Sequence, residues 1–306
     1  MRRRGVVCVL AGALLIGFTG GDGGFAGHQK AWADGTPVVW TDDEMPELPL
    51  DSYEFEGADG KAYDRVEEAQ RLLTQRCMVR HGFADFPLDP KYPGAGSSTT
   101  VRGIVIAGTG PVGTYDLAAA RRWGYGWDPQ RKIALPGPKG REMTIEESAV
   151  YYGDRHTERS GCYGEAYRRL ERGVRNSRQM WAYVSTRESA VRKQAPHDPR
   201  LRRAFARWAD CVEDKGFKRY TDPAAAYGAK EWKRGQDGNT TRTPREVGTA
   251  VADIECKRSL NTAGVWWSVA QRLQRRELAL HKAEFEGARK GRDRLLANAR
   301  AVLAPS

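Results

Sequence analysis

CMVRHGFADFPLDP, from Cys77 to Pro90, and CVEDKGFKRYTDP, from Cys211 to Pro223, are two copies of one pattern. Each copy opens with a cysteine and an apolar residue, places Gly-Phe five positions after the cysteine, and closes on Asp-Pro. Glycine readily takes the left-handed conformation that ends many helices, and the residue after it then contacts an apolar side chain in the last turn. Both copies are therefore predicted to end a helix and to present a cysteine near that end.

The sequence around both copies predicts a series of helices. Asp64 and Asp198 lie 13 residues before the two motif cysteines, where they are suited to cap the motif helices, and a proline follows Asp198 as is common in a first turn. Thr144 and Glu147 form a capping box before another helix. With apolar periodicity included, the predicted helices cover residues 65–80, 115–122, 145–152, 163–172, 177–193, 199–215, 223–232 and 244–256.

A long C-terminal helix is predicted, and from Thr262 to Leu303 nothing in the sequence forbids one helix of about 60 Å, at about 1.5 Å per residue; whether it is continuous is left open. Gly287 and Gly291 weaken its second half, so a kink or fraying is expected there. That half is rich in Lys and Arg, which favours a protruding basic arm. Acidic residues interleave the basic ones, and a solvated face of mixed charge is the alternative interpretation.

These elements predict a mainly α fold: an irregular helical bundle with two disulfides, a small β-hairpin or loop insertion, and a long C-terminal helix. The insertion is placed at Thr99–Ala107 (TTVRGIVIA), the most strongly β-like run of the chain. The predicted parts are a signal peptide (1–33), an extended N-terminal arm (34–62), a first Cys-motif helical half (63–175), and a second Cys-motif half with the long C-terminal helix (176–306).

The N-terminus has the features of an export signal. Arg2, Arg3 and Arg4 precede an apolar run of residues 5–18, and Ala31-Trp32-Ala33 fits a cleavage site after Ala33. Fourteen apolar residues are too few to span a bilayer, so no stable membrane span is expected after cleavage. Cleavage removes four basic residues and one acidic residue, and the net charge falls from +11 to +8. A basic exported protein could bind anionic wall polymers, lipid head groups or nucleic acid, although basic charge also serves solubility alone.

Cleavage leaves four cysteines, Cys77, Cys162, Cys211 and Cys256. An even number in an oxidising compartment favours two disulfides, for which three connectivities exist. The repeat favours Cys77–Cys162 and Cys211–Cys256, because each motif cysteine then pairs with the next cysteine along the chain. Such loops, of about 85 and 45 residues, would each contribute roughly 4 kcal/mol by the chain-entropy model.

A metal site is the alternative use of these cysteines. His81 follows Cys77 by four residues on the same helix face, and the two could bind a metal with Cys162 and His156. However, Lys215 replaces His81 in the second copy, while both cysteines remain. Disulfides fit both copies and a metal fits one, so no metal is predicted.

A glycine-rich loop follows the β-like run. Residues 108–113 match the GxGxxG pattern of dinucleotide sites. No second strand of a βαβ unit follows, and Pro111 lies inside the loop, so a hairpin or flexible loop is the favoured interpretation. No cofactor is predicted.

The motif copies also support a family resemblance. Cys77-Met78 with Gly82-Phe83 resembles the "CM-x-x-x-G" signature of small secreted proteins and lipoproteins of actinobacteria. The wider layout is similar to larger, uncharacterised exported proteins of that group; its matching stretches are LPLDSY (48–53), WGYG (123–126), Gly161-Cys162 with Glu165-Ala166, and Trp208 with Cys211-Val212. This chain departs from the pattern at Val212, where Met is commoner, and it lacks a lipobox. The resemblance implies an envelope or extracellular location and brings no catalytic residues.

Enzymatic residues are sparse. A glycoside hydrolase needs two carboxylates about 5–9.5 Å apart in a cleft, and Glu146, Glu147 and Glu165 are candidates. Glu147 already has a capping role, which leaves Glu165 as the catalytic candidate. Aromatic platforms could bind sugars, but in a helical protein tryptophans more often fill the core; the candidates are Trp123, Trp127, Trp181, Trp208, Trp232, Trp266 and Trp267.

The sequence therefore favours a secreted or wall-associated, non-enzymatic protein that binds a wall component or a partner protein. An anionic cell-wall polymer and another envelope protein are the expected partners, nucleic acid is not expected, and the oligomeric state is left open. The alternative is an envelope hydrolase that uses a carboxylate pair. A carboxylate pair in an open cleft would favour the enzyme, and a closed helical core with a protruding basic helix would favour binding.

Overall fold

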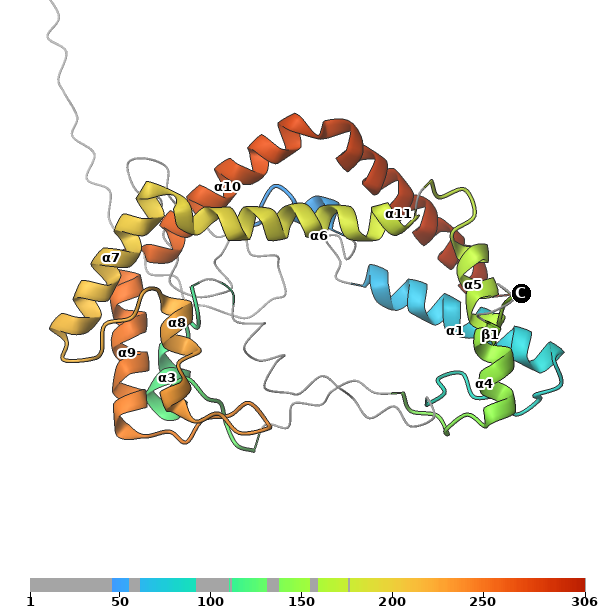
Figure 1. Ribbon diagram of the computed structural model, residues 1–306, viewed down its shortest axis with the longest axis horizontal. Helices are drawn as coiled ribbons and strands as arrows, with labels where there is room; N and C mark the ends of the chain where they lie inside the picture. The colour runs from blue at the N-terminus through green and yellow to red at the C-terminus, as the bar shows by residue number, and fades with distance from the viewer. Residues whose placement is uncertain are drawn as a thin grey trace, which may run out of the picture.

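The structure, a computed structural model, describes residues 46–54, 61–91, 110, 112–130, 138–154, 159–175 and 177–305. The predicted signal peptide, the run at Thr99–Ala107, and His156 lie outside this part of the chain. The described part is mainly helical, as predicted (Figure 1). Its α-helices are α1 (Ala62–Arg80), α3 (Leu117–Trp123), α4 (Ile145–Tyr152), α5 (Cys162–Leu170), α6 (Ser177–Gln194), α7 (Pro199–Asp214), α8 (Pro223–Tyr227), α9 (Pro244–Ser259), α10 (Thr262–Leu280) and α11 (Lys282–Leu303). Short elements are the 3-10 turns η2 (Asp51–Tyr53), η4 (Ala195–His197) and η5 (Lys230–Trp232), and the antiparallel pair β1 (Gly153–Asp154) and β2 (Arg159–Ser160).

Two helical clusters lie at opposite ends of the molecule (Figure 1). The first-motif cluster contains α1, α4 and α5, and the second-motif cluster contains α3, α7, α8 and α9. Three helices, α6, α10 and α11, run between the clusters and are called the bridge helices below. They pack on one another as well as on both clusters, since α11 contacts α1 and α6 while α10 contacts α7.

Both motif copies end their helices as predicted. Gly82 and Gly216 have φ angles of +97° and +85°, in the left-handed region that favours glycine. In both copies the amide of the following phenylalanine donates to the carbonyl of the residue after the cysteine, at 3.2 Å. This is the hydrogen bond of a Schellman motif. It turns the chain sharply away from the helix and brings the phenylalanine back against the last turn.

The motif cysteines form the predicted disulfides. Cys77 of α1 is bonded to Cys162 at the start of α5, with a Cα–Cα distance of 5.5 Å. Cys211 of α7 is bonded to Cys256 of α9, with a Cα–Cα distance of 5.9 Å. The first bond lies in a small core with Met78, Phe86, Met143 and Tyr151. Each disulfide therefore ties two helices of one cluster through that cluster's own core.

A buried polar network ties the chain before α3 to α9. Lys257 and Asp253 are both 0% exposed and form an ion pair at 3.1 Å. The Lys257 ammonium donates to the Val112 carbonyl at 2.8 Å, and the Trp208 indole donates to Asp253 Oδ1 at 3.0 Å. Burial raises the pKa of Asp253 to about 6, while Lys257 and the hydrogen bonds from Tyr125 and Trp208 oppose that rise. Since every charged atom has a partner, this network fixes the second-motif cluster.

The predicted long C-terminal helix is present as α11, and the open question of whether it continues from α10 is answered by a break between the two helices. The chain bends at His281, where φ is −129° and ψ is 35°, and α10 and α11 form two arms (Figure 1). Packing explains the bend. Val269 and Leu273 of α10 are buried against α7, and Leu295 of α11 is buried against α1 and α5. A single bent pair of helices covers the cores at both ends, and this burial outweighs the local preference for a continuous helix.

Two smaller expectations also change. α1 begins at Ala62 with Lys61 as its N-cap, so Asp64 lies in the first turn instead of capping the helix. An acidic residue in the first turn still interacts favourably with the helix dipole. The distal half of the C-terminal region does not protrude, because Leu295, Leu296 and Ala299 of α11 are buried in a core shared with α1.

The arm residues 46–54 lie on the bridge helices. Leu50 is 0% exposed, and its amide donates to the Gln274 side chain at 2.8 Å. The Arg292 guanidinium donates to the carbonyls of Ser52 and Glu54 at 3.0 and 2.8 Å. Burial, followed by a hydrogen bond and repulsion from Glu188, raises the pKa of Glu54 to about 7. Asp51 adds repulsion, and Arg192 offsets part of it.

Substitution of the motif glycines tests the helix-end role. Gly82→Ala and Gly216→Ala should each lower the free energy of unfolding by about 1 kcal/mol, because a Cβ strains a backbone with positive φ even though no atom lies within 4 Å of it. Gly287→Ala is the matched control within α11, also with nothing within 4 Å. It should raise stability by about 0.5–1 kcal/mol through helix propensity. Urea unfolding measures all three, and stabilisation by Gly82→Ala would contradict the motif assignment.

Glu54→Gln tests the acidic contact of the arm. In the unfolded chain Glu54 has its ordinary pKa, whereas in the folded chain the pKa is raised. The folded state therefore keeps this proton while the unfolded state loses it, and stability falls as the pH rises toward and through 7. Glutamine does not ionise, so the variant should exceed the wild type by about 1 kcal/mol at pH 8, after solvent screening, and differ little at pH 5. Urea unfolding at both pH values checks this; exposed Glu68→Gln should show no such pH dependence.

Candidate functional site

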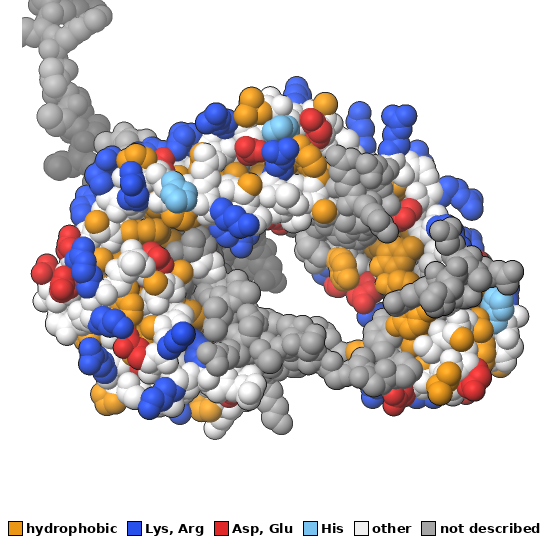
Figure 2. All heavy atoms as spheres, in the orientation of Figure 1, with side chains coloured by type: hydrophobic (Ala, Val, Ile, Leu, Met, Phe, Trp, Pro, Cys, Tyr) orange, Lys and Arg blue, Asp and Glu red, His pale blue; other side chains and the backbone are white. Residues whose placement is uncertain are grey.

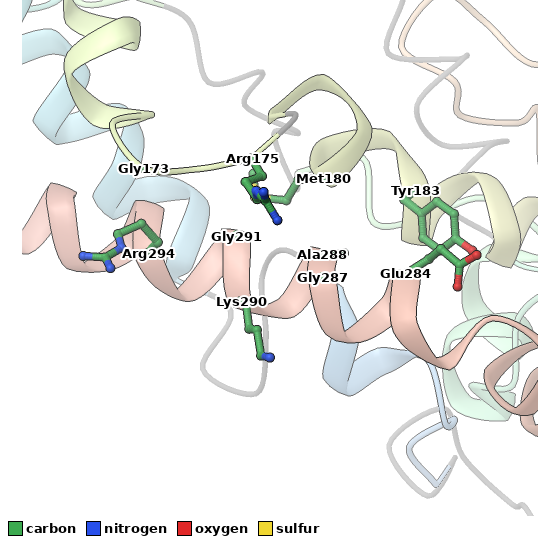
Figure 3. A pocket seen from close by; sticks show the side chains of 10 residues that line it. All are labelled: Gly173, Arg175, Met180, Tyr183, Glu284, Gly287, Ala288, Lys290, Gly291 and Arg294. Atoms are coloured by element: carbon green, nitrogen blue, oxygen red, sulfur yellow. The ribbon is translucent and has the colours of Figure 1, made fainter.

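A groove lies between α11 and the start of α6 (Figure 3). Its volume is about 480 Å³, and its lining comes from the loop before α6, from α6, and from α11. The lining residues are Gly173, Arg175, Met180, Tyr183, Glu284, Gly287, Ala288, Lys290, Gly291 and Arg294. The groove therefore joins residues that are more than 100 positions apart in the sequence.

The position of the loop follows from two local features. Gly173 has a φ of +78°, which lets the chain reverse after α5. The Asn298 side chain on α11 donates to the carbonyls of Leu170 and Arg172 at 2.6 and 2.9 Å. These bonds satisfy carbonyls at the end of α5 and hold the loop beside α11. Arg175 is thereby placed over the middle of that helix.

Small residues form the floor of the groove. A Cβ on Gly291 would lie 2.8 Å from the Met180 sulfur, so glycine allows α6 and α11 to approach closely there. One turn earlier, a Cβ on Gly287 would meet nothing within 4 Å, so the groove is open at that point. Ala288 is 7% exposed and Met180 is also 7% exposed. The floor is consequently apolar and narrow at one end.

Three cations border this floor. Arg175, Lys290 and Arg294 are exposed, and none of them forms an ion pair with a described side chain. Figure 3 shows Arg175 pointing from the loop toward α11, Lys290 pointing to the opposite side, and Arg294 at the far end. The one acidic residue in the lining, Glu284, lies 3.9 Å from His281. The groove therefore has an excess of positive charge that extends along the helix.

Two other basic residues of α11, Arg289 and Arg292, differ from these three. Arg289 pairs with Glu286 at 2.6 Å, and Arg292 pairs with Asp293 at 3.2 Å. Figure 2 shows Lys and Arg side chains along the edge of the molecule that α11 forms in Figure 1. The acidic residues of α11 therefore neutralise Arg289 and Arg292. Lys290 and Arg294 have no such partner among the described side chains and can bind an anion.

Glu165, the catalytic candidate of the alternative hydrolase interpretation, does not lie in this groove. Its side chain is 55% exposed near the start of α5 and pairs with Arg80 at 3.2 Å. Glu147, another candidate, is 3% exposed and completes the capping box with Thr144 while Arg141 binds both of its oxygens at 2.6 and 2.8 Å. Arg141 lowers the pKa of Glu147. Both carboxylates therefore have structural partners, Arg80 for Glu165 and Arg141 for Glu147.

The candidate metal ligands are partly brought together. His81 and the sulfurs of Cys77 and Cys162 have ligand atoms within 4.8 Å of one another. The two sulfurs are bonded to each other, so neither is a thiolate in this form. His156, the fourth candidate, lies outside the described residues.

Several tryptophans belong to the core, as the sequence favours. Trp208, Trp232 and Trp267 are 0%, 2% and 8% exposed. In the glycine-rich loop, Gly113 is described and has a φ of +66°, and a Cβ there would lie 3.6 Å from the Lys257 ammonium. That ammonium binds the loop's own carbonyls, so this part of the loop contributes to a buried structural network.

The comparisons with known proteins give no match: no family model fits the chain, and no curated protein or solved structure is significantly similar to it. Among the described residues, no helix has the length and apolar composition needed to cross a membrane. The site is therefore interpreted from its own geometry and charge.

Proposed function

We propose that this chain is an exported, non-enzymatic protein of the cell envelope that binds an anionic wall polymer in the groove between α6 and α11. The observation that carries the proposal is the set of three cations around an open, glycine-lined floor, none of which has an ion-pair partner among the described side chains. Two disulfides support an oxidising compartment, where such bonds persist. The resemblance to secreted actinobacterial proteins supports the same location.

The arrangement of the cations favours a polymer over a small anion. Lys290 and Arg294 are four residues apart on α11, and Arg175 faces that helix from the loop. Their side chains do not converge on one point in Figure 3. A polymer that carries repeated negative charges can contact successive turns of a helix, where side chains lie about 5–6 Å apart. Its carbon backbone would lie on the apolar floor of Gly287, Ala288 and Gly291.

Binding through these cations should depend strongly on salt concentration. Contacts between exposed cations and an anionic chain are screened by salt, with a screening length of about 8 Å at physiological ionic strength. Each contact contributes little alone, so affinity depends on several contacts made together. Binding should therefore be strong at low salt and fall steeply as salt increases.

The test is co-sedimentation of the mature protein with isolated actinobacterial cell walls at increasing salt. A variant with Arg175→Gln, Lys290→Gln and Arg294→Gln should lose at least fivefold of the bound fraction at low salt. The matched control carries Lys193→Gln, Arg203→Gln and Arg207→Gln, which removes the same number and type of exposed charges outside the groove. The control should retain most of its binding.

Three outcomes would count against the proposal. Failure of the wild type to sediment with walls at low salt would exclude wall binding. Equal losses in the groove variant and the control would show attraction by net charge without a site. A fall in wall turbidity during incubation that Glu165→Gln abolishes would support the hydrolase alternative instead.

A further inference from the structure

The first motif copy contains a donor set that the disulfide alone does not explain. Cys77, Cys162 and His81 place two sulfurs and an imidazole within 4.8 Å of one another. Glu165 Oε2 lies 3.6 Å from the Cys77 sulfur, while its other oxygen pairs with Arg80 at 3.2 Å. Two sulfurs, one imidazole nitrogen and one carboxylate oxygen are ligand types that Zn²⁺ binds in tetrahedral sites.

The second copy shows that the disulfide does not require these neighbours. Lys215 occupies the position of His81 there, and its ammonium donates to Glu255 at 2.9 Å. A protonated amine has no lone pair to offer a metal ion, and its charge repels one. The Cys211–Cys256 bond nevertheless forms between α7 and α9. The metal-ligating environment is thus specific to the first copy.

We propose that the first copy is a redox-gated Zn²⁺ site, filled when Cys77 and Cys162 are thiols and closed when they form the disulfide. His81 supplies the third ligand, and Glu165 supplies the fourth. This proposal is independent of the groove, because no residue of the donor set lines it. The site would hold the two cysteines of one correct pair together before the disulfide forms.

The chemistry balances in both directions. A phosphine or dithiol reductant gives two electrons to the S–S bond, and the two sulfurs take up two protons. Zn²⁺ then displaces those protons and forms two Zn–S bonds and one bond to the imidazole of His81. A disulfide oxidant later removes two electrons from the sulfurs, the S–S bond forms again, and zinc leaves with its charge unchanged.

The geometry allows an ion to enter. His81 is exposed and the Glu165 side chain is 55% exposed, whereas both cysteines are 2% exposed behind them. The ion can therefore approach from the surface on the side of the imidazole. The Cα atoms of the cysteines are 5.5 Å apart, so sulfurs released from their bond remain within reach of one ion at Zn–S distances of about 2.3 Å.

The test uses the full mature chain, reduced anaerobically with a phosphine and titrated with Co²⁺ and then Zn²⁺. We expect one Co²⁺ per chain with the visible absorption of a tetrahedral thiolate site, and displacement of that ion by Zn²⁺. Alkylation mapped by mass spectrometry should be slowed by metal at Cys77 and Cys162 and unchanged at Cys211 and Cys256. His81→Lys, which gives the first copy the residue of the second, should weaken metal binding at least tenfold. Lys215→Ala is the control and should bind as the wild type does.

Circular dichroism before and after metal addition shows whether the reduced chain keeps its helices, so a failure to bind metal can be told apart from unfolding. The proposal is overturned if the reduced wild type binds no metal, if His81→Lys binds equally well, or if metal protects the second cysteine pair as strongly as the first. It is also overturned if the reduced chain loses its helices and metal does not restore them, since the site requires α1 and α5 to be in place.

Discussion

Each end of this molecule has its own small hydrophobic core, and one covalent bond between two helices closes each core. Each core needs this covalent bond because it is small: a cluster of a few short helices buries too little apolar surface to be stable alone. The first-motif core contains Met78, Phe86, Met143 and Tyr151 around the Cys77–Cys162 bond. A disulfide of this loop length contributes about as much as the net stability of a small domain. The Schellman turn after each motif helix then places the following phenylalanine, Phe83 or Phe217, against the core that contains that bond.

The bridge helices follow from the same constraint. Two separate cores must be held in one molecule, and α10 and α11 achieve this by packing on opposite ends, with the bend at His281 between them. α6 must approach α11 closely, and Gly291 permits this against Met180. Where the close contact ends, at Gly287, the two helices leave an open groove. The candidate binding site is thus a consequence of how the bridge is packed, and its charge comes from residues that the packing leaves at the border.

The features that could be predicted from sequence are those set by local chemistry. The helix ends at Gly82 and Gly216, the capping box at Thr144, and the cap at Asp198 each depend on a few adjacent residues. The pairing of the cysteines followed from the repeat. The bend at His281 could not be predicted, because it depends on burial against helices far away in the sequence, while the local sequence points to Gly287 and Gly291. The groove was missed for the same reason, because only the fold brings Arg175 beside Lys290; the pairing of Arg289 and Arg292 with acidic neighbours three residues and one residue away is local and could be read from spacing.

The two motif copies differ at a position that has no architectural role, position 81 in the first copy and position 215 in the second. That difference is the most informative one. Cysteine, glycine and phenylalanine have the same structural roles in both copies, so position 81 in the first and position 215 in the second are free to differ. At the second position an ammonium forms an ion pair with Glu255 beside the disulfide. At the first, an imidazole lies beside two sulfurs and a carboxylate that Arg80 holds in place. An exposed ion pair contributes at most about 1 kcal/mol, so stability alone gives little reason to prefer lysine at one site and histidine at the other. Ligand chemistry does distinguish them, since only the imidazole can share a metal ion with the sulfurs when the bond between them is open.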